Sequence, residues 1–170
     1  VISSAQSTIT GWPGYSATPL ISLESIASAC GVRAVYYKDE AQRFNLKSFK
    51  ALGGAYAVAQ LVNDEKEAGR DPSKLTVTTA TDGNHGRSVS WGAQLAGCHA
   101  EIYIHKHVSM AREAAMAHFG ATVTRVDGNY EASLAACKAD SEKHGWHIIS
   151  DTSWDGYRDI PLLIMAGYTL

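Results

Sequence analysis

The sequence has little cysteine, no dominant charge and no long apolar run. Its three cysteines, Cys30, Cys98 and Cys137, are widely spaced and form no CxxC motif. An odd number at such spacings indicates reduced thiols and favours a cytoplasmic protein. No apolar run has the length of a membrane span, and the N-terminal residues lack the basic and apolar regions of a signal peptide.

An excess of positive charge is also missing. The 15 Lys and Arg residues are scattered and stand against 17 Asp and Glu, which gives a formal net charge of −2 over 170 residues. This balance argues against nucleic acid or an anionic membrane as the main partner. The composition, 45% hydrophobic and 19% charged, is that of a globular domain that can bury a core without disulfides or metal.

Several catalytic signatures do not occur. There is no GxSxG nucleophile elbow, and the glycine-containing loop at 83–86 is neither a Walker loop nor a GxGxxG fingerprint. Seven histidines include the close pairs His105/His107 and His144/His147, but neither pair has a cysteine or acid at ligand spacing. We therefore expect no metal site.

The second half of the chain contains a regular alternation of strand and helix patterns. Apolar, β-branched segments predict strands at 75–80, 100–104, 121–126 and 147–150. Helical patterns lie between them, at 87–95, 109–120 and 130–144. With short links, this order predicts an α/β fold: an open, mostly parallel sheet with helices on both faces and right-handed crossovers.

The first half is less regular. Residues 1–20 show no strong period, and we expect a short helix over 20–29, closed by Gly31, and a strand over 32–37. A longer helix is expected from Ser48 to about Glu67, with Ser48 as its N-cap.

Lys50 falls in the first turn of that predicted helix. A cation there is poorly placed against the helix dipole, and burial would add to this effect. Both favour a neutral amine, as an imine-forming lysine requires. An ordinary solvated lysine at the start of a helix is the other interpretation of this stretch.

Two acids follow predicted strands. Asp82 comes directly after the strand at 75–80 and Asp151 after the strand at 147–150. Ligands of open α/β sheets bind beyond the carboxyl ends of the strands, so both acids are candidate site residues. Each has a structural alternative, as a helix cap or turn residue. The glycines on either side of Asn84 would let the backbone approach a ligand closely.

These motifs resemble the fold-type II pyridoxal-phosphate enzymes, the threonine dehydratase and cysteine synthase group. Ser48-Phe49-Lys50, the Gly-Asn-His loop and the upstream Thr18-Pro19-Leu20 carry the resemblance, which runs from about Thr18 to Leu170. Asp82, where relatives usually have Ser or Ala, and the segment from Asp151 to Tyr157 point to the diaminopropionate ammonia-lyase family within this group.

The resemblance implies an activity, a cofactor and residue roles. Pyridoxal 5′-phosphate (PLP) would be the cofactor, with Lys50 as its imine-forming lysine, Asn84 bonded to its ring oxygen and Phe49 beside its ring. The reaction would be α,β-elimination of 2,3-diaminopropionate, a small amino acid, to pyruvate and ammonia, in a homodimer. A carboxylate within reach of the α-carbon can remove its proton, and two carboxylates on different loops can approach from opposite faces. Our own hypothesis is therefore that Asp82 and Asp151 are catalytic and serve opposite stereoisomers.

The resemblance also implies a domain division. Residues 1–48 would belong to a larger domain, 49–158 would form the smaller α/β domain, and 159–170 would begin the return to the larger one. The glycine-rich phosphate loop of these enzymes does not occur here, so we expect an N-terminal portion with weak cofactor binding and little activity. The alternatives are a related serine- or threonine-type dehydratase, or a non-catalytic α/β module.

Overall fold

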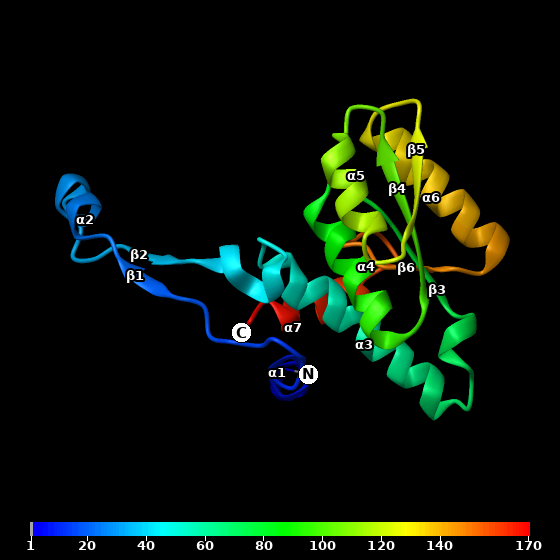
Figure 1. The fold of residues 1–170 in the computed structure, drawn as a ribbon, viewed down its shortest axis with the longest axis horizontal. Helices are drawn as coiled ribbons and strands as arrows, with labels where there is room; N and C mark the ends of the chain where they lie inside the picture. Colours follow the sequence, from blue (N-terminus) through cyan, green and yellow to red (C-terminus); the bar gives the residue numbers. More distant parts are fainter. Residues whose placement is uncertain (1) are drawn as a thin grey trace.

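An arm made of a β-hairpin and a short helix projects from the main body of the molecule (Figure 1). The computed structural model describes residues 2–170. The helices are α1 (Ile2–Thr10), α2 (Glu24–Cys30), α3 (Lys50–Glu67), α4 (Asn84–Ala96), α5 (Met110–Ala117), α6 (Tyr130–His144) and α7 (Asp159–Gly167), with the 3₁₀ turns η1 (Glu40–Asn45) and η2 (Pro72–Lys74). The strands are β1 (Leu20–Ser22), β2 (Tyr36–Lys38), β3 (Thr76–Ala80), β4 (His99–His105), β5 (Thr122–Val126) and β6 (His147–Ile148).

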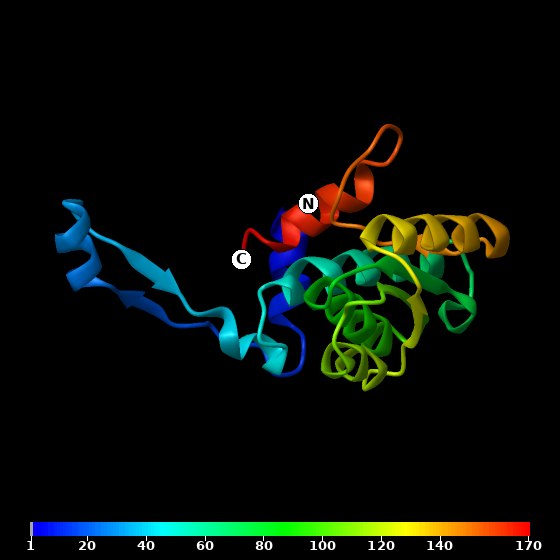
Figure 2. The same cartoon turned by 90° about the horizontal axis from the view of Figure 1, so that it is seen from above.

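The body contains the predicted parallel sheet. Its four strands are ordered β5-β4-β3-β6, and every neighbouring pair is parallel. α6 packs on β3 and β4, whereas α4 contacts the same strands and α5 contacts β5. Figure 2 shows α6 on one face of the sheet and α5 on the other, so the expected α/β fold with helices on both faces is confirmed. No helix in the part of the chain that the structure describes is long and apolar enough to cross a membrane.

The central strands β3 and β4 are mostly buried, whereas the edge strand β5 is partly exposed. Val77, Thr78 and Ile102 have no exposed surface, and Val77 and Ile102 belong to a core that also takes side chains from α3 and α4. Both β3 and β6 end at the edge where Asp82 and Asp151 follow them. The fold therefore brings the two acids to one end of the sheet, as the strand order requires.

The first half of the chain differs from the prediction. Residues 20–29 were expected to be one helix, but β1 occupies the first three and pairs antiparallel with β2, Leu20 opposite Lys38. The expected strand at 32–37 is shortened and displaced to β2. Gly31 does close α2, in the left-handed conformation that glycine adopts without strain (φ 64°).

Three helix starts also differ from the prediction. α4 begins at Asn84 and not at residue 87, because most of the expected loop at 83–86 forms its first turn. α3 begins at Lys50, two residues later than expected, although Ser48 Oγ still accepts a hydrogen bond from the Lys50 amide (3.1 Å). α1 was missed because Ala5 and Ile9, which are fully buried one helical turn apart, stand among small polar residues that give no period.

At the base of the arm, Arg43 is almost fully buried and bonded on every side. Its Nε contacts Glu40 Oε2 (2.7 Å), and its two terminal nitrogens reach Glu40 Oε1 (2.8 Å) and the Ser16 carbonyl (2.9 Å). Thr18 Oγ1 accepts from the same guanidinium (3.0 Å) and donates to Glu40. This network attaches the arm to the segment that leads to α3.

We predict that Glu40→Gln destabilises the protein by about 1.5 kcal/mol at pH 7, because it weakens charged hydrogen bonds to a buried guanidinium. Burial opposes ionisation of Glu40, but the bonds from Arg43 and Thr18 lower the pKa of Glu40 below its ordinary 4.5. This stabilisation is fully present above pH 4.5 and is lost as the pH falls through the folded-state pKa. Urea unfolding at several pH values should show the difference between wild type and variant shrinking below pH 4.5, and a constant difference would contradict it.

α3 and α4 lie against each other because small residues meet where they cross. A Cβ at Gly92 would lie 2.7 Å from Ala55 Cα and 3.0 Å from Ala55 Cβ, closer than real atoms approach. We predict that Gly92→Ala costs about 2 kcal/mol, since overpacking against backbone exceeds the gain in helix propensity. The control is Gly11→Ala, where a Cβ meets nothing closer than 3.4 Å and stability should change little. Equal unfolding midpoints for Gly92→Ala and wild type would contradict the prediction.

Candidate active site

A strained loop precedes Lys50 and fixes where α3 begins. Three residues of this loop that are not glycine have positive φ: Phe44 (48°), Asn45 (58°) and Lys47 (56°). Such backbone persists only where its surroundings hold it, and here Arg87 on α4 donates to the Leu46 carbonyl (3.2 Å). The loop is therefore fastened to α4.

A second contact between α3 and α4 holds the first turn of α3. Ser88 Oγ donates to the Lys50 carbonyl (2.7 Å) and accepts from the Ala55 amide (3.1 Å). Ser88 is buried, so these bonds are shielded from water. They fix the backbone of Lys50 relative to α4.

The side chain of Lys50 ends against Asp151 and two aromatic rings. Nζ lies 2.6 Å from Asp151 Oδ2 and 5.4 Å from the ring centroids of both Phe49 and Tyr168, whose rings contact each other edge to face at 4.9 Å. Residues 101 positions apart in the sequence thus form an ion pair. The sequence carried no sign of this carboxylate partner, and the neutral amine expected at Lys50 stays a prediction.

Asp151 also lies beside His85. Burial raises the pKa of the Asp151 carboxyl. The charge that His85 carries at acidic pH, where its ring is protonated, and the hydrogen bond and charge of Lys50 together bring that pKa below its ordinary value. Complete burial in turn lowers the pKa of the His85 imidazole, against the opposing effects of Asp151 and the Ile149 carbonyl. His85 is therefore neutral near pH 7, and the ammonium of Lys50 keeps Asp151 ionised.

Asp82 has a different environment. Its side chain is 65% exposed, and Oδ1 lies 2.9 Å from His105 Nε2. The Asp82 carbonyl accepts from Arg112 on α5 (3.1 Å), and Thr81 Oγ1 accepts from two amides of the loop, which fixes the turn into α4. Asp82 thus faces solvent and a histidine, whereas Asp151 faces the lysine.

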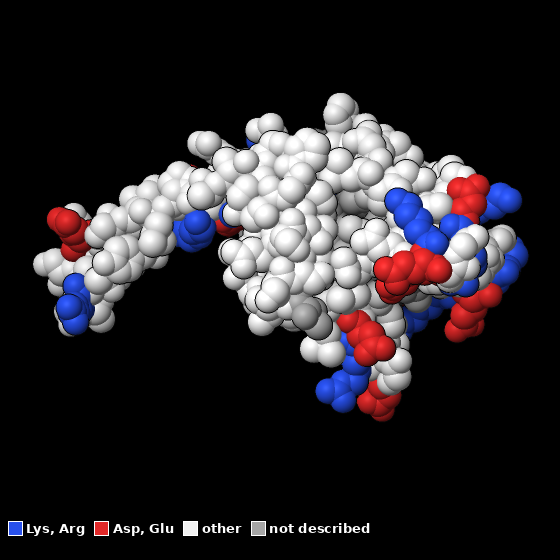
Figure 3. Space-filling view, turned by 90° about the horizontal axis from the view of Figure 1, so that it is seen from below, with Lys and Arg blue, Asp and Glu red and all other residues white. Residues whose placement is uncertain are grey.

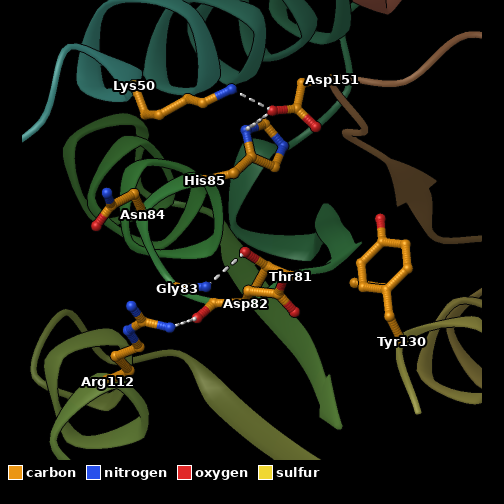
Figure 4. A pocket seen from close by; sticks show the side chains of 10 residues that line it. Lys50, Thr81, Asp82, Gly83, Asn84, His85, Arg112, Tyr130 and Asp151 are labelled. Carbon is orange, nitrogen blue, oxygen red and sulfur yellow. Dashed lines mark hydrogen bonds and ion pairs between the residues drawn. The ribbon is translucent and has the colours of Figure 1, made fainter. Parts of the chain in front are cut away.

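These side chains surround one cavity of about 350 Å³ (Figure 4). It is lined by Lys50, Ala80, Thr81, Asp82, Gly83, Asn84, His85, Arg112, Tyr130 and Asp151. Of the residues expected from the sequence, Lys50, Asp82, Asn84 and Asp151 therefore come together here. Phe49 lies outside the lining, next to the Lys50 amine.

Three other residues at this cavity, and one beside it, had no role in the sequence analysis. Arg112 and Tyr130 come from α5 and α6, and their place at the cavity depends on how these helices pack. Tyr168 lies next to the Lys50 amine, outside the cavity lining. His85 was part of the Gly-Asn-His loop, and its adjacency to Asn84 was the one signal that could have identified it.

The fold and this cavity define a class of protein. Residues 12–168 match the family described as "Pyridoxal-phosphate dependent enzyme", and the chain belongs to that family. Within it, the chain is similar to diaminopropionate ammonia-lyases. It is 40% identical over 166 residues to that of Escherichia coli strain K12, and 36% identical over 173 residues to that of Salmonella typhimurium strain LT2.

These similarities cover most of this chain and less than half of each relative. The two alignments span 91% and 92% of the chain and 42% of the relatives. The crystal structure of the Escherichia coli enzyme in complex with D-serine superposes with a TM-score of 0.91 at 38% identity, over 98% of this chain and 46% of that one. The chain therefore spans about two fifths of the length of the curated relatives it matches.

The residues at the cavity fit part of the family's cofactor. Lys50 presents an amine at the cavity wall, Phe49 and Tyr168 offer apolar rings beside it, and the first turn of α4 provides backbone amides with no partner within the helix. An aldehyde and an aromatic ring can be held by such groups. Apart from Gly83 and Gly86 at the start of α4, residues 2–170 contain no glycine-rich loop that could hold the phosphate.

Proposed function

We propose that the protein is a PLP-dependent ammonia-lyase that eliminates ammonia from 2,3-diaminopropionate and releases pyruvate and a second ammonia. The observation that carries this proposal is the meeting of the Lys50 amine and the Asp151 carboxylate at 2.6 Å, in a cavity that Asp82 also lines. An amine beside a carboxylate is what cofactor attachment followed by proton removal requires. The similarity to diaminopropionate ammonia-lyases names the substrate.

Each residue would have one task. Lys50 would hold the cofactor through its aldehyde, Asn84 would bond the ring oxygen, and Phe49 would pack beside the ring. When bound, the cofactor supplies an acceptor for the electron pair left on the α-carbon of the substrate. Asp151 and Asp82, on separate loops, would each remove the α-proton from one stereoisomer.

The domain division is part of the proposal: residues 1–48 join a larger domain, 49–158 form the smaller one, and 159–170 begin the return. The arm supports it. Six apolar side chains on the arm are 42–65% exposed: Leu20, Ile21, Ile26, Val32, Tyr36 and Tyr37. Figure 3 shows charged side chains at the tip of the arm and where it joins the body, and an uncharged surface between them and over the adjoining part of the body, whereas most charges gather at the opposite end. A further domain could cover this surface.

We also propose a cytoplasmic homodimer. The free cysteines Cys30, Cys98 and Cys137 suit a reducing compartment. On α7, Ile164 is buried but Leu162 and Met165 are 60% and 45% exposed, which leaves an apolar surface for a partner. Sedimentation equilibrium of the protein from its complete reading frame would measure the mass directly.

Borohydride reduction in the presence of PLP tests the proposed function. The protein is expressed from its complete reading frame, reduced, digested and mapped by mass spectrometry, and pyruvate release from diaminopropionate is assayed in parallel. A pyridoxyl adduct on Lys50 with pyruvate formation would support the proposal. Labelling spread over many lysines, without pyruvate, would favour a non-catalytic module. Faster release of an oxo acid from serine or threonine would favour the dehydratase alternative.

A further inference from the structure

The two ring nitrogens of His85 have different surroundings: one has a hydrogen-bond partner and the other has none. Nε2 lies 2.7 Å from the carbonyl oxygen of Ile149, and because a carbonyl only accepts, Nε2 carries the proton of the neutral ring. Nδ1 is then a bare lone pair. This atom is buried, has no hydrogen-bond partner within residues 2–170, and lies 3.7 Å from Asp151 Oδ2.

With a neutral ring and an ionised carboxylate, no hydrogen bond can form between His85 Nδ1 and Asp151 Oδ2. Both atoms are acceptors, so neither can donate to the other, and a buried acceptor left without a donor is costly. Figure 4 shows the side chains of Lys50 and His85 converging on Asp151 from two sides. Lys50 supplies the donor that Asp151 needs, but nothing supplies one to His85. A single added proton between the two atoms would satisfy both.

We propose that His85 is a positioning residue that shares with Asp151 the proton taken from the substrate. This inference rests on the proposed function. The C–H bond at the α-carbon of the substrate breaks, its electron pair stays with the carbon, and the proton goes to Oδ2 of Asp151. The new O–H group donates to Nδ1 of His85, and the proton is held between them until it is passed to the β-amino group as that group leaves as ammonia.

The groups around the pair permit this exchange. The Lys50 amine donates to the same carboxylate oxygen (2.6 Å), and it would leave that oxygen if it held the cofactor aldehyde. Tyr130, Tyr157 and Tyr168 also face Asp151, and burial raises the pKa of each phenol, so they remain neutral near pH 7. The proton that Asp151 gains therefore has His85 as a ready acceptor.

Asp82 also lies beside a histidine, but there the histidine donates a hydrogen bond to the carboxylate. His105 Nδ1 accepts from the His107 amide (3.2 Å), so its Nε2 carries the proton and donates to Asp82 Oδ1 (2.9 Å). A donor stabilises the ionised carboxylate, whereas the bare Nδ1 of His85 stabilises the protonated acid. The proposal thus applies to the acid beside Lys50 and not to the other one.

Nitrogen NMR of the histidine rings tests the pair in the protein without cofactor, expressed from its complete reading frame. At pH 7 the wild type should show His85 with its proton on Nε2 and a bare Nδ1. In Lys50→Ala, which removes the competing ammonium, the Nδ1 signal of His85 should shift toward the protonated value, while that of His105 stays unchanged. A proton on Nδ1 in the wild type, or an unshifted signal in Lys50→Ala, would overturn the proposal.

Turnover of the protein loaded with PLP gives the second readout. Asp151→Asn identifies the stereoisomer that depends on Asp151. His85→Gln, which keeps a donor for the Ile149 carbonyl but cannot bind a proton, should lower kcat for that isomer about tenfold with KM within twofold. The other isomer serves as the internal control and should change less than twofold. Equal slowing of both isomers would assign His85 a merely structural role.

The two measurements distinguish failure of the proposed function from failure of the proton sharing between His85 and Asp151. If the wild type turns over neither isomer of diaminopropionate, the proposed function fails, and the NMR result still decides whether His85 and Asp151 share a proton. If turnover is normal and the NMR signals stay unchanged, the pair fails and the function stands.

Discussion

Lys50→Ala is expected to reduce pyruvate formation from diaminopropionate by at least about 10³-fold, because it removes the amine that would hold the cofactor aldehyde. The contacts around Lys50 make the loss specific. Ser88 holds the backbone of α3 through its bonds to the Lys50 carbonyl and the Ala55 amide, which the substitution leaves in place. The helix should therefore remain while the chemistry is lost. Steady-state kinetics with purified protein and added PLP would measure the change.

Lys66→Ala is the matched control, because Lys66 lies on the same helix and is exposed at its far end. It should retain pyruvate formation within about twofold, since surface substitutions away from a site have small effects. Circular dichroism would verify that both variants fold. If Lys50→Ala kept more than a tenth of wild-type turnover, another lysine would have to hold the cofactor, and borohydride mapping of that variant would locate it.

The central sheet could be predicted because its signal is local. The segment from Leu75 to Ala80 is apolar or β-branched throughout, as a strand buried on both faces must be, and α6 begins and ends at clear caps. Asn129 accepts from the Ala132 amide at the start of α6, and Gly145 closes the helix in the left-handed conformation (φ 69°). Strand order then brought Asp82 and Asp151 to the same edge.

Two features could not be predicted: the arm, and which groups of the site pair with each other. Both depend on contacts between distant parts of the chain, and no single stretch of sequence indicates them. β1 and β2 are three residues each and exposed, so their pairing leaves no alternating pattern in the sequence. The 2.6 Å contact between Lys50 and Asp151, and the side of the imidazole that His85 presents, depend on how α3, α4 and β6 pack. The sequence indicates which residues lie at one edge, and packing decides which of them share a proton.

Asp82→Asn and Asp151→Asn are expected to stop the turnover of opposite stereoisomers of diaminopropionate, each by at least about 10²-fold, the usual contribution of a general base. The two carboxylates line one cavity from different loops, so they can approach the α-carbon from different directions. An amide retains the shape of the side chain but cannot take up a proton. Each variant should therefore keep most of its activity toward the isomer that uses the other acid.

The measurement is kcat for the D- and L-isomers in wild type and both variants, all in the protein loaded with PLP. Binding should change little for Asp82→Asn, because the Asp82 side chain is exposed and contacts His105 rather than Lys50. Asp151→Asn removes the carboxylate beside Lys50 and should also weaken attachment of the cofactor, which its absorbance would report. Equal losses for both isomers in both variants would show that the acids act together on one face of the substrate, and the division between them would be wrong.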